Sequence, residues 1–161
     1  VSRMQSSMAE AVDRLWGMRA PDLPFETREE AVILASIVER ETGVPQERGL
    51  VAGVFVNRLR RGIRLQSEPT VASGISPDGL HRPLTRVDLK EPTPYNTYVI
   101  NGLPPTPIAN PGIEAIRAVM NPVPTDYLYF VADGSGGHAF ARTLAEHNRN
   151  VRKWRKIRDA N

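Results

Sequence analysis

The segment LASIVERETG, residues 34–43, decides how this sequence is interpreted. It is an apolar run at helical spacing that ends in two glutamates, Glu39 and Glu41, just before a glycine. At about 100° per residue, Glu41 lies roughly 20° from Leu34 and roughly 40° from Ile37, in the middle of the apolar arc. Glu39 lies roughly 160° from Glu41. We therefore expect the two carboxylates to face different sides of one helix and to have different roles.

The position of Glu41 favours a protonated carboxyl group. A carboxylate on the core-facing side of a helix is costly unless it is paired, and the dipole at the C-terminal turn adds a further unfavourable interaction with an anion. A neutral carboxylic acid near physiological pH is what general-acid cleavage of a glycosidic bond requires. The alternative is that Glu41 pairs with an arginine of the following helix, such as Arg58, and has only a structural role.

The composition describes one domain with an ordinary core. The chain has 161 residues, of which 40% are hydrophobic, and contains no apolar run close to the ~20 residues that span a bilayer. A formal charge of +3 permits an anionic partner without requiring one. With no cysteine, a disulfide framework and thiol chemistry are excluded. The three histidines form no helical i,i+4 pair, so we expect neither a metal site nor another cofactor.

Helix signals divide the first 62 residues. Apolar side chains from Met4 to Trp16 recur at helical spacing and predict an amphipathic helix, which with its linker makes up residues 1–26. Thr27 and Glu30 form a capping box that opens the next helix and a domain over 27–161. A further helix is expected from residue 45 to a stop at residue 62, with small residues that let a neighbouring helix approach. Because the chain starts inside a helix and without an initiator Met, we expect it to be part of a longer protein.

The second half of the chain contains more turns. Residues 63–110 predict loops with short strands, the first in IRLQSEPTV, and one minor helix over 85–90. Asn110 and Pro111 predict the start of a helix through residue 120. Two β-type runs around DGSGG then predict a hairpin, and Thr143 with Glu146 caps a basic final helix.

Four segments together carry a resemblance to a known family. LASIVERETG, VAGVFVNRLRRGIRLQSEPTV, PYNTYVINGLPPTPIANPG and YLYFVADGSGGHAFARTLAEHN follow one another, within residues 31–148, in the order and spacing of the YceG-like endolytic murein transglycosylases. The chain resembles that family. The resemblance implies an α+β fold with helices around a substrate cleft, small β elements and a lysozyme-like catalytic helix.

The resemblance also implies a site and a reaction. Its helix-terminal catalytic glutamate matches Glu41, with Glu39 as a supporting residue. Glu41 is expected to protonate the leaving oxygen of the bond between N-acetylmuramic acid and N-acetylglucosamine. As a carboxylate it then removes a proton from the muramyl 6-hydroxyl, which gives a 1,6-anhydro end. The expected partners are murein glycan strands and, as candidates, peptidoglycan synthases. The expected location is the periplasmic face of the bacterial inner membrane, through an N-terminal anchor absent from this chain, as is most of a LysM-like region.

Polar and aromatic residues outside the helix are candidates for substrate binding. Two tyrosines flanking an amide and a hydroxyl, in YNTY, offer apolar faces to sugar rings and hydrogen bonds to hydroxyl and N-acetyl groups. These candidates also have structural alternatives. The two tyrosines could be core residues, and the polar residues that follow IRL could be ordinary turn residues. Asn57 could tie down a loop instead of orienting Glu41. The candidate substrate-binding residues are Asn57, Gln66, Ser67, Glu68, Thr70, Tyr95, Asn96, Thr97, Tyr98 and His138.

Two other classes of function fit parts of the sequence. A non-catalytic glycan-binding module would use the tyrosines and Gln66 while Glu41 stayed structural. The run NRNVRKWRKIR, residues 148–158, could contact nucleic acid, but a charge run on a terminal helix is usually a solvated face, so we expect no nucleic-acid partner.

Overall fold

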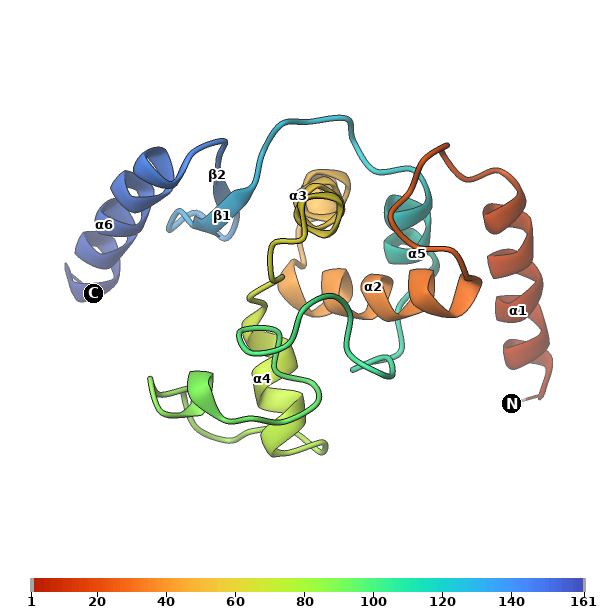
Figure 1. The fold of residues 1–161 in the computed structure, drawn as a ribbon, viewed down its shortest axis with the longest axis horizontal. Helices are drawn as coiled ribbons and strands as arrows, with labels where there is room; N and C mark the ends of the chain where they lie inside the picture. The colour runs from red at the N-terminus through yellow and green to blue at the C-terminus, as the bar shows by residue number, and fades with distance from the viewer. Residues whose placement is uncertain (1, 161) are drawn as a thin grey trace.

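The computed structural model describes residues 2–160, with side chains from residue 6 onward, so the side chain of Met4 lies outside the described residues. Its helices and one small antiparallel sheet confirm the predicted α+β class (Figure 1). Among residues 2–160, no helix is long and apolar enough to cross a bilayer. The elements are α1 (Ser2–Gly17), α2 (Arg28–Glu41), the 3-10 helix η1 (Pro45–Glu47), α3 (Arg48–Arg61), α4 (Glu68–Ile75), the 3-10 helix η2 (Asp88–Lys90), α5 (Ile113–Met120), β1 (Tyr129–Ala132), β2 (His138–Ala141) and α6 (Leu144–Ala160).

Helix α2 lies at the centre of the fold and packs against both α3 and α5, which also pack against each other (Figure 1). Its sequence is apolar on almost every side over residues 33–38, and such a helix is buried all round rather than along one stripe. Leu34 and Ile37 are fully buried against a core that includes Phe55 of α3 and Ile116 of α5. Burying each of these side chains contributes about 1.5–3 kcal/mol. The core therefore fixes α2, and with it the position of its C-terminal turn.

The hairpin and α6 lie at one end of the molecule, opposite α1 (Figure 1). Strands β1 and β2 pair from Tyr129 with Ala141 to Ala132 with His138, which confirms the predicted hairpin. Phe130 meets the ring of Phe55 edge to face, with 5.7 Å between ring centroids, and so joins the hairpin to α3. Helix α6 packs on both strands.

Three of the predicted helix boundaries are confirmed. Thr27 Oγ1 accepts a hydrogen bond from the Glu30 backbone N–H at 3.2 Å, and Glu30 Oε1 accepts from the Glu26 backbone N–H and the Thr27 hydroxyl. Thr143 likewise caps α6 through the Glu146 backbone N–H. Helix α3 stops at Gly62, whose φ of 68° is a left-handed conformation that glycine adopts without strain.

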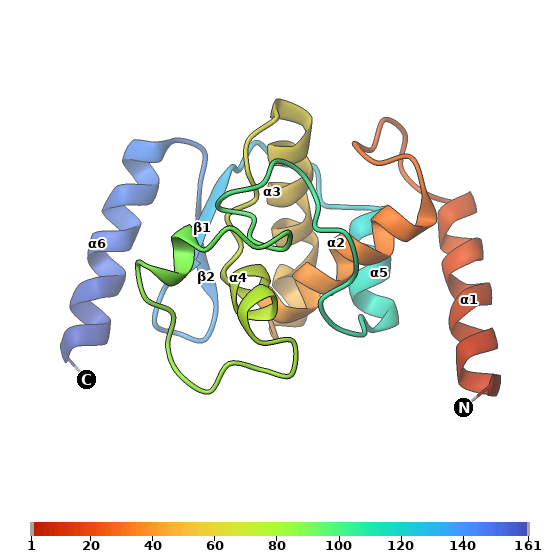
Figure 2. The same cartoon turned by 60° about the horizontal axis from the view of Figure 1, so that its bottom comes forward.

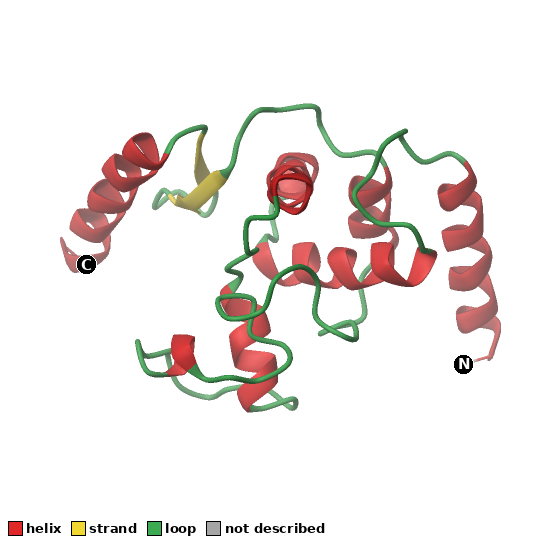
Figure 3. Ribbon diagram, in the orientation of Figure 1, coloured by secondary structure: helices red, strands yellow, loops and turns green. Residues whose placement is uncertain are grey.

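The expected strand in IRLQSEPTV is wrong, because residues 68–75 form helix α4. Pro69 lies in the first turn, where a missing N–H costs nothing. A segment of eight residues is too short for its periodicity to distinguish a helix from a strand. The expected helix over 85–90 shrinks to η2, and the described loop between α4 and α5 contains no strand (Figure 3). Figure 2 shows this long loop, with α4, coming forward.

Two further local expectations are corrected. Helix α5 starts at Ile113 with Gly112 as N-cap, two residues later than Asn110 and Pro111 predicted. Gly53 of α3 faces an extended segment instead of a helix, since a Cβ at Gly53 would lie 2.8 Å from the carbonyl oxygen of Val123.

Candidate active site

The last turn of α2 brings Glu41 against the N-terminus of α4. The Ser67 hydroxyl donates a hydrogen bond to Glu41 Oε1 at 3.1 Å. Burial raises the pKa of Glu41 from 4.5 to about 7, the Ser67 hydrogen bond opposes this rise, and the negative charge of Glu68 adds to it. The side chain is partly buried, so it keeps access to solvent. Glu41 is therefore a carboxyl group that exchanges a proton near neutral pH.

Buried hydroxyl groups hold Ser67 in place. The Ser67 backbone N–H donates to Thr97 Oγ1 at 2.8 Å, and the Thr70 hydroxyl donates to the Ser67 carbonyl at 2.6 Å. Thr70 Oγ1 and Thr97 Oγ1 lie 2.8 Å apart and share a hydrogen bond. Ser67 is 2% exposed, and Thr70 and Thr97 are fully buried. Their role is to fix the serine that contacts Glu41, which leaves little of these threonines for a substrate.

Gln66 has a backbone conformation that is uncommon for a residue other than glycine. Its φ is 52°, in the left-handed region, which costs roughly 1–2 kcal/mol. The Gln66 backbone N–H donates to the Thr97 carbonyl at 3.2 Å, which ties this turn to the same threonine. The Gln66 side chain is exposed, beside the buried Ser67. Strain of this kind clusters at functional sites.

In the YNTY segment, Tyr98 lies near Glu41 and Asn96 shapes the loop. Burial raises the pKa of Tyr98 to about 12, and the carboxylates of Glu68 and Glu41 act in the same direction, so its hydroxyl keeps its proton. Asn96 is fully buried. Its amide nitrogen donates to the carbonyls of residues 89 and 91, and its Oδ1 accepts from the Tyr98 backbone N–H. Asn96 therefore folds the loop that presents Tyr98.

Tyr95 and Glu68 remain open to solvent to different degrees. The Tyr95 hydroxyl lies 2.7 Å from Thr106 Oγ1, so its ring braces the long loop while staying partly exposed. Glu68, the first residue of α4, is exposed and adds negative charge beside Glu41.

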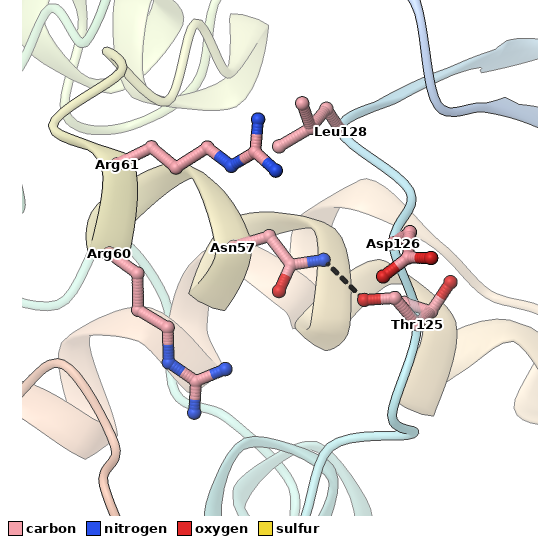
Figure 4. Close-up of a pocket in the computed structure, with 6 residues that line it drawn as sticks. All are labelled: Asn57, Arg60, Arg61, Thr125, Asp126 and Leu128. Atoms are coloured by element: carbon pink, nitrogen blue, oxygen red, sulfur yellow. Dashed lines mark hydrogen bonds between the residues drawn. The ribbon is translucent and has the colours of Figure 1, made fainter.

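Asn57 has a structural role in a different pocket (Figure 4). Its amide nitrogen donates to the carbonyls of Thr125 and Tyr127, at 2.7 and 2.9 Å. The pocket beside it is lined by Asn57, Arg60, Arg61, Thr125, Asp126 and Leu128. Of the two alternatives for Asn57, tying down a loop describes its contacts.

His138 contacts a glutamate that the sequence did not single out. Glu47 Oε1 lies 2.7 Å from His138 Nδ1, and Glu47 Oε2 accepts from the His138 backbone N–H at 2.9 Å. Both side chains are about 15% exposed. The pair joins the hairpin to the start of α3. No short-range sequence signal could have found it, because the two residues are 91 positions apart.

Glu39 and Glu41, near the end of α2, contact different elements, as their spacing predicts. Glu39 Oε1 accepts a hydrogen bond from the Gly112 backbone N–H at 2.7 Å, next to the start of α5. The predicted alternative of an ion pair between Glu41 and Arg58 is wrong, because the Arg58 guanidinium donates to the carbonyls of Leu128 and Arg64. In the described part of the chain, no group of three or more His, Asp or Glu side chains is arranged to hold a metal ion.

Comparison with known proteins identifies the family. The sequence pattern of the YceG-like family matches residues 1–153. The chain is similar to the endolytic murein transglycosylases of Bacillus subtilis, at 43% identity over 75% of this chain and 33% of the relative, and of Streptococcus pneumoniae strain D39, at 37% over 78% and 23%. It is also similar to the crystal structure of a YceG-like protein from Listeria monocytogenes, with a TM-score of 0.69 and 39% identity, over 76% of this chain and 38% of that one. The chain thus spans a third or less of the length of these two transglycosylases. With a family match over residues 1–153, it belongs to the YceG-like family.

Proposed function

We propose that this chain is a lytic transglycosylase domain that cleaves murein glycan strands internally, between N-acetylmuramic acid and N-acetylglucosamine. The observation that carries the proposal is the carboxyl group of Glu41, with a pKa of about 7, held by the buried Ser67. The similarity to proteins named endolytic murein transglycosylases, over three quarters of this chain, supports it.

The reaction needs one carboxyl group in two protonation states. Glu41 as an acid gives its proton to the glycosidic oxygen, and the bond between that oxygen and the muramyl anomeric carbon breaks. Glu41 as a carboxylate then takes the proton of the muramyl 6-hydroxyl while O6 bonds to the anomeric carbon. Glu41 thereby regains a proton, and no water is consumed. A pKa near 7 suits both steps, because each form is populated at neutral pH.

Hydrolysis is a second candidate reaction, because Glu68 brings another carboxylate close to Glu41. Ordinary glycosidases pair an acid with a second carboxylate that acts as nucleophile or activates water. Glu68 is exposed at the start of α4, and its charge raises the pKa of Glu41. In that reaction Glu41 would be the acid and Glu68 its partner.

Mass spectrometry of products from purified glycan strands tests the proposal. We expect internal fragments with anhydromuramyl ends, one water lighter than hydrolysis products. Reducing ends would establish the hydrolase instead. Strand binding without any product would favour a non-catalytic glycan-binding module.

The substrate also determines where the protein works. Because murein lies outside the cytoplasmic membrane, we propose that the chain works on the outer, periplasmic face of that membrane. Peptidoglycan synthases, which make the strands, are the partners we propose. Fractionation of cells and crosslinking to synthases test these two points.

A further inference from the structure

Gln66 has a left-handed backbone conformation that its own side chain does not explain. Among the described residues, a positive φ otherwise occurs at glycines and at Asp22, whose φ is 60°. Aspartate adopts this region more readily than most residues, because its short polar side chain can hydrogen-bond locally. Glutamine has a longer side chain and lacks this advantage. A glycine at position 66 would therefore form the same turn with less strain.

The fold does not use the Gln66 side chain for its own structure. The side chain is exposed, and in the part of the chain that the structure describes no residue hydrogen-bonds its amide. The contact that anchors this residue is made by its backbone N–H, which donates to the Thr97 carbonyl at 3.2 Å. The residues on either side, Leu65 and Ser67, are each 2% exposed. The amide of Gln66 is therefore available to a ligand.

Chain connectivity places Gln66 next to the candidate acid. The following residue, Ser67, donates its hydroxyl to Glu41 Oε1 at 3.1 Å. Because consecutive Cα atoms are about 3.8 Å apart, the Gln66 Cα lies within roughly 10 Å of that carboxyl oxygen. Thr70 and Thr97 hold Ser67 from the buried side. Backbone strain persists only where the surroundings fix it, and it clusters at sites that contact ligands.

The side chain of glutamine matches one group of a murein strand. It offers a carbonyl acceptor and two N–H donors. The N-acetyl group of a strand sugar offers one N–H donor and one carbonyl acceptor, so the two amides can form a pair of hydrogen bonds. Both groups are uncharged, and a contact between them is insensitive to salt.

We propose that Gln66 is a specificity-determining residue whose side-chain amide binds an N-acetyl group of the strand, beside the bond that Glu41 cleaves. This inference rests on the proposed function. The left-handed turn presents the amide while Ser67 stays in contact with Glu41. Relief of the strain should therefore make the protein more stable and also a weaker binder, whereas a purely structural role would change stability and binding in the same direction.

Gln66→Gly in a Glu41→Gln background tests the inference without turnover. We expect the melting temperature to rise by ~1–4 °C, because relief of the left-handed strain exceeds the entropy that glycine adds to the unfolded chain. The affinity for purified N-acetylated strands should fall about tenfold, through the loss of two hydrogen bonds. Asp22→Gly changes the other left-handed residue, which is also exposed, and should keep the affinity of the background protein. A melting temperature that does not rise, an unchanged affinity, or a background protein that binds no strands overturns the inference.

Gln66→Met in the same background separates the amide from the backbone. Methionine keeps a side chain of similar length and the left-handed strain, so we expect little change in melting temperature and the same fall in affinity. Partial de-N-acetylation of the strands should weaken binding by the background protein more than binding by Gln66→Met, because this variant has already lost the contact. The charge of the freed amines acts equally on both proteins. Equal weakening overturns the assignment to the N-acetyl group.

Failure of the proposed function has a different signature. The Gln66 variants would then change strand affinity as expected, while the protein with Glu41 intact released no products from the same strands.

Discussion

Replacing Glu41 by glutamine should stabilise the fold at alkaline pH and change its stability little at pH 4. The folded state raises the pKa of Glu41 from 4.5 to about 7, so the folded protein holds this proton more tightly than the unfolded chain. The parent therefore loses stability as the pH rises through this interval. At about 1.4 kcal/mol per pKa unit, the loss reaches ~3 kcal/mol by pH 8. Glutamine does not ionise and its oxygen can still accept the Ser67 hydrogen bond, so the variant avoids this loss.

Thermal unfolding of the parent and Glu41→Gln at pH 4, 6 and 8 measures the effect. At roughly 2–4 °C per kcal/mol for a domain of this size, the variant should melt ~6–12 °C above the parent at pH 8. Glu39→Gln removes a carboxylate from the same helix and serves as the control, and any pH dependence it shares is subtracted. A difference in melting temperature between Glu41→Gln and the parent that does not grow with pH would refute the inference that the folded state raises the pKa of the Glu41 carboxyl group.

Three further changes test the surroundings of the site. Ser67→Ala removes a hydrogen bond that lowers the pKa of Glu41, so the alkaline limb of the pH–activity profile should move upward by about one unit. Asn96→Ala should lower the free energy of unfolding by ~2–4 kcal/mol in urea titrations, because it removes a fully buried side chain and leaves three partly buried backbone groups without their partner. Gly53→Val should cost ~2–3 kcal/mol in the same assay, since a Cβ there lies 2.8 Å from a backbone oxygen, whereas Gly17→Ala, with open space around it, should be neutral or stabilising.

The helix ends could be predicted from sequence because their signals are local. Thr27 and Glu30 are three residues apart, and the hydrogen bonds between them form whatever the rest of the chain does. Gly62 similarly ends α3 by its own conformation. Helix α4 was missed because eight residues carry too little periodicity, and the burial of Thr70 and Val71 against distant parts of the chain stabilises it.

Only part of the site could be predicted, because the partners of its residues come from segments that are distant in the sequence. Periodicity places Glu41 on the buried side of α2, but its partner Ser67 comes from a segment 26 residues away. Asn57 could be named from sequence as a candidate that either orients Glu41 or ties down a loop, but the carbonyls that its amide binds are about 70 residues away. A helical pattern shows which side of a helix is buried and carries no information on which segment covers it.

The central claim is that Glu41 is the acid that cleaves the strand, and the rate of internal strand cleavage by Glu41→Gln measures it most directly. The rate is compared with those of the parent and Glu39→Gln on the same purified strands at pH 7, with thermal unfolding and strand binding recorded for each protein. We expect Glu41→Gln to be folded, to bind strands and to release no products, while Glu39→Gln, whose contact is with the start of α5, keeps most of the parent rate. Cleavage by Glu41→Gln at the parent rate, or an inactive Glu39→Gln beside an active Glu41→Gln, would contradict the claim.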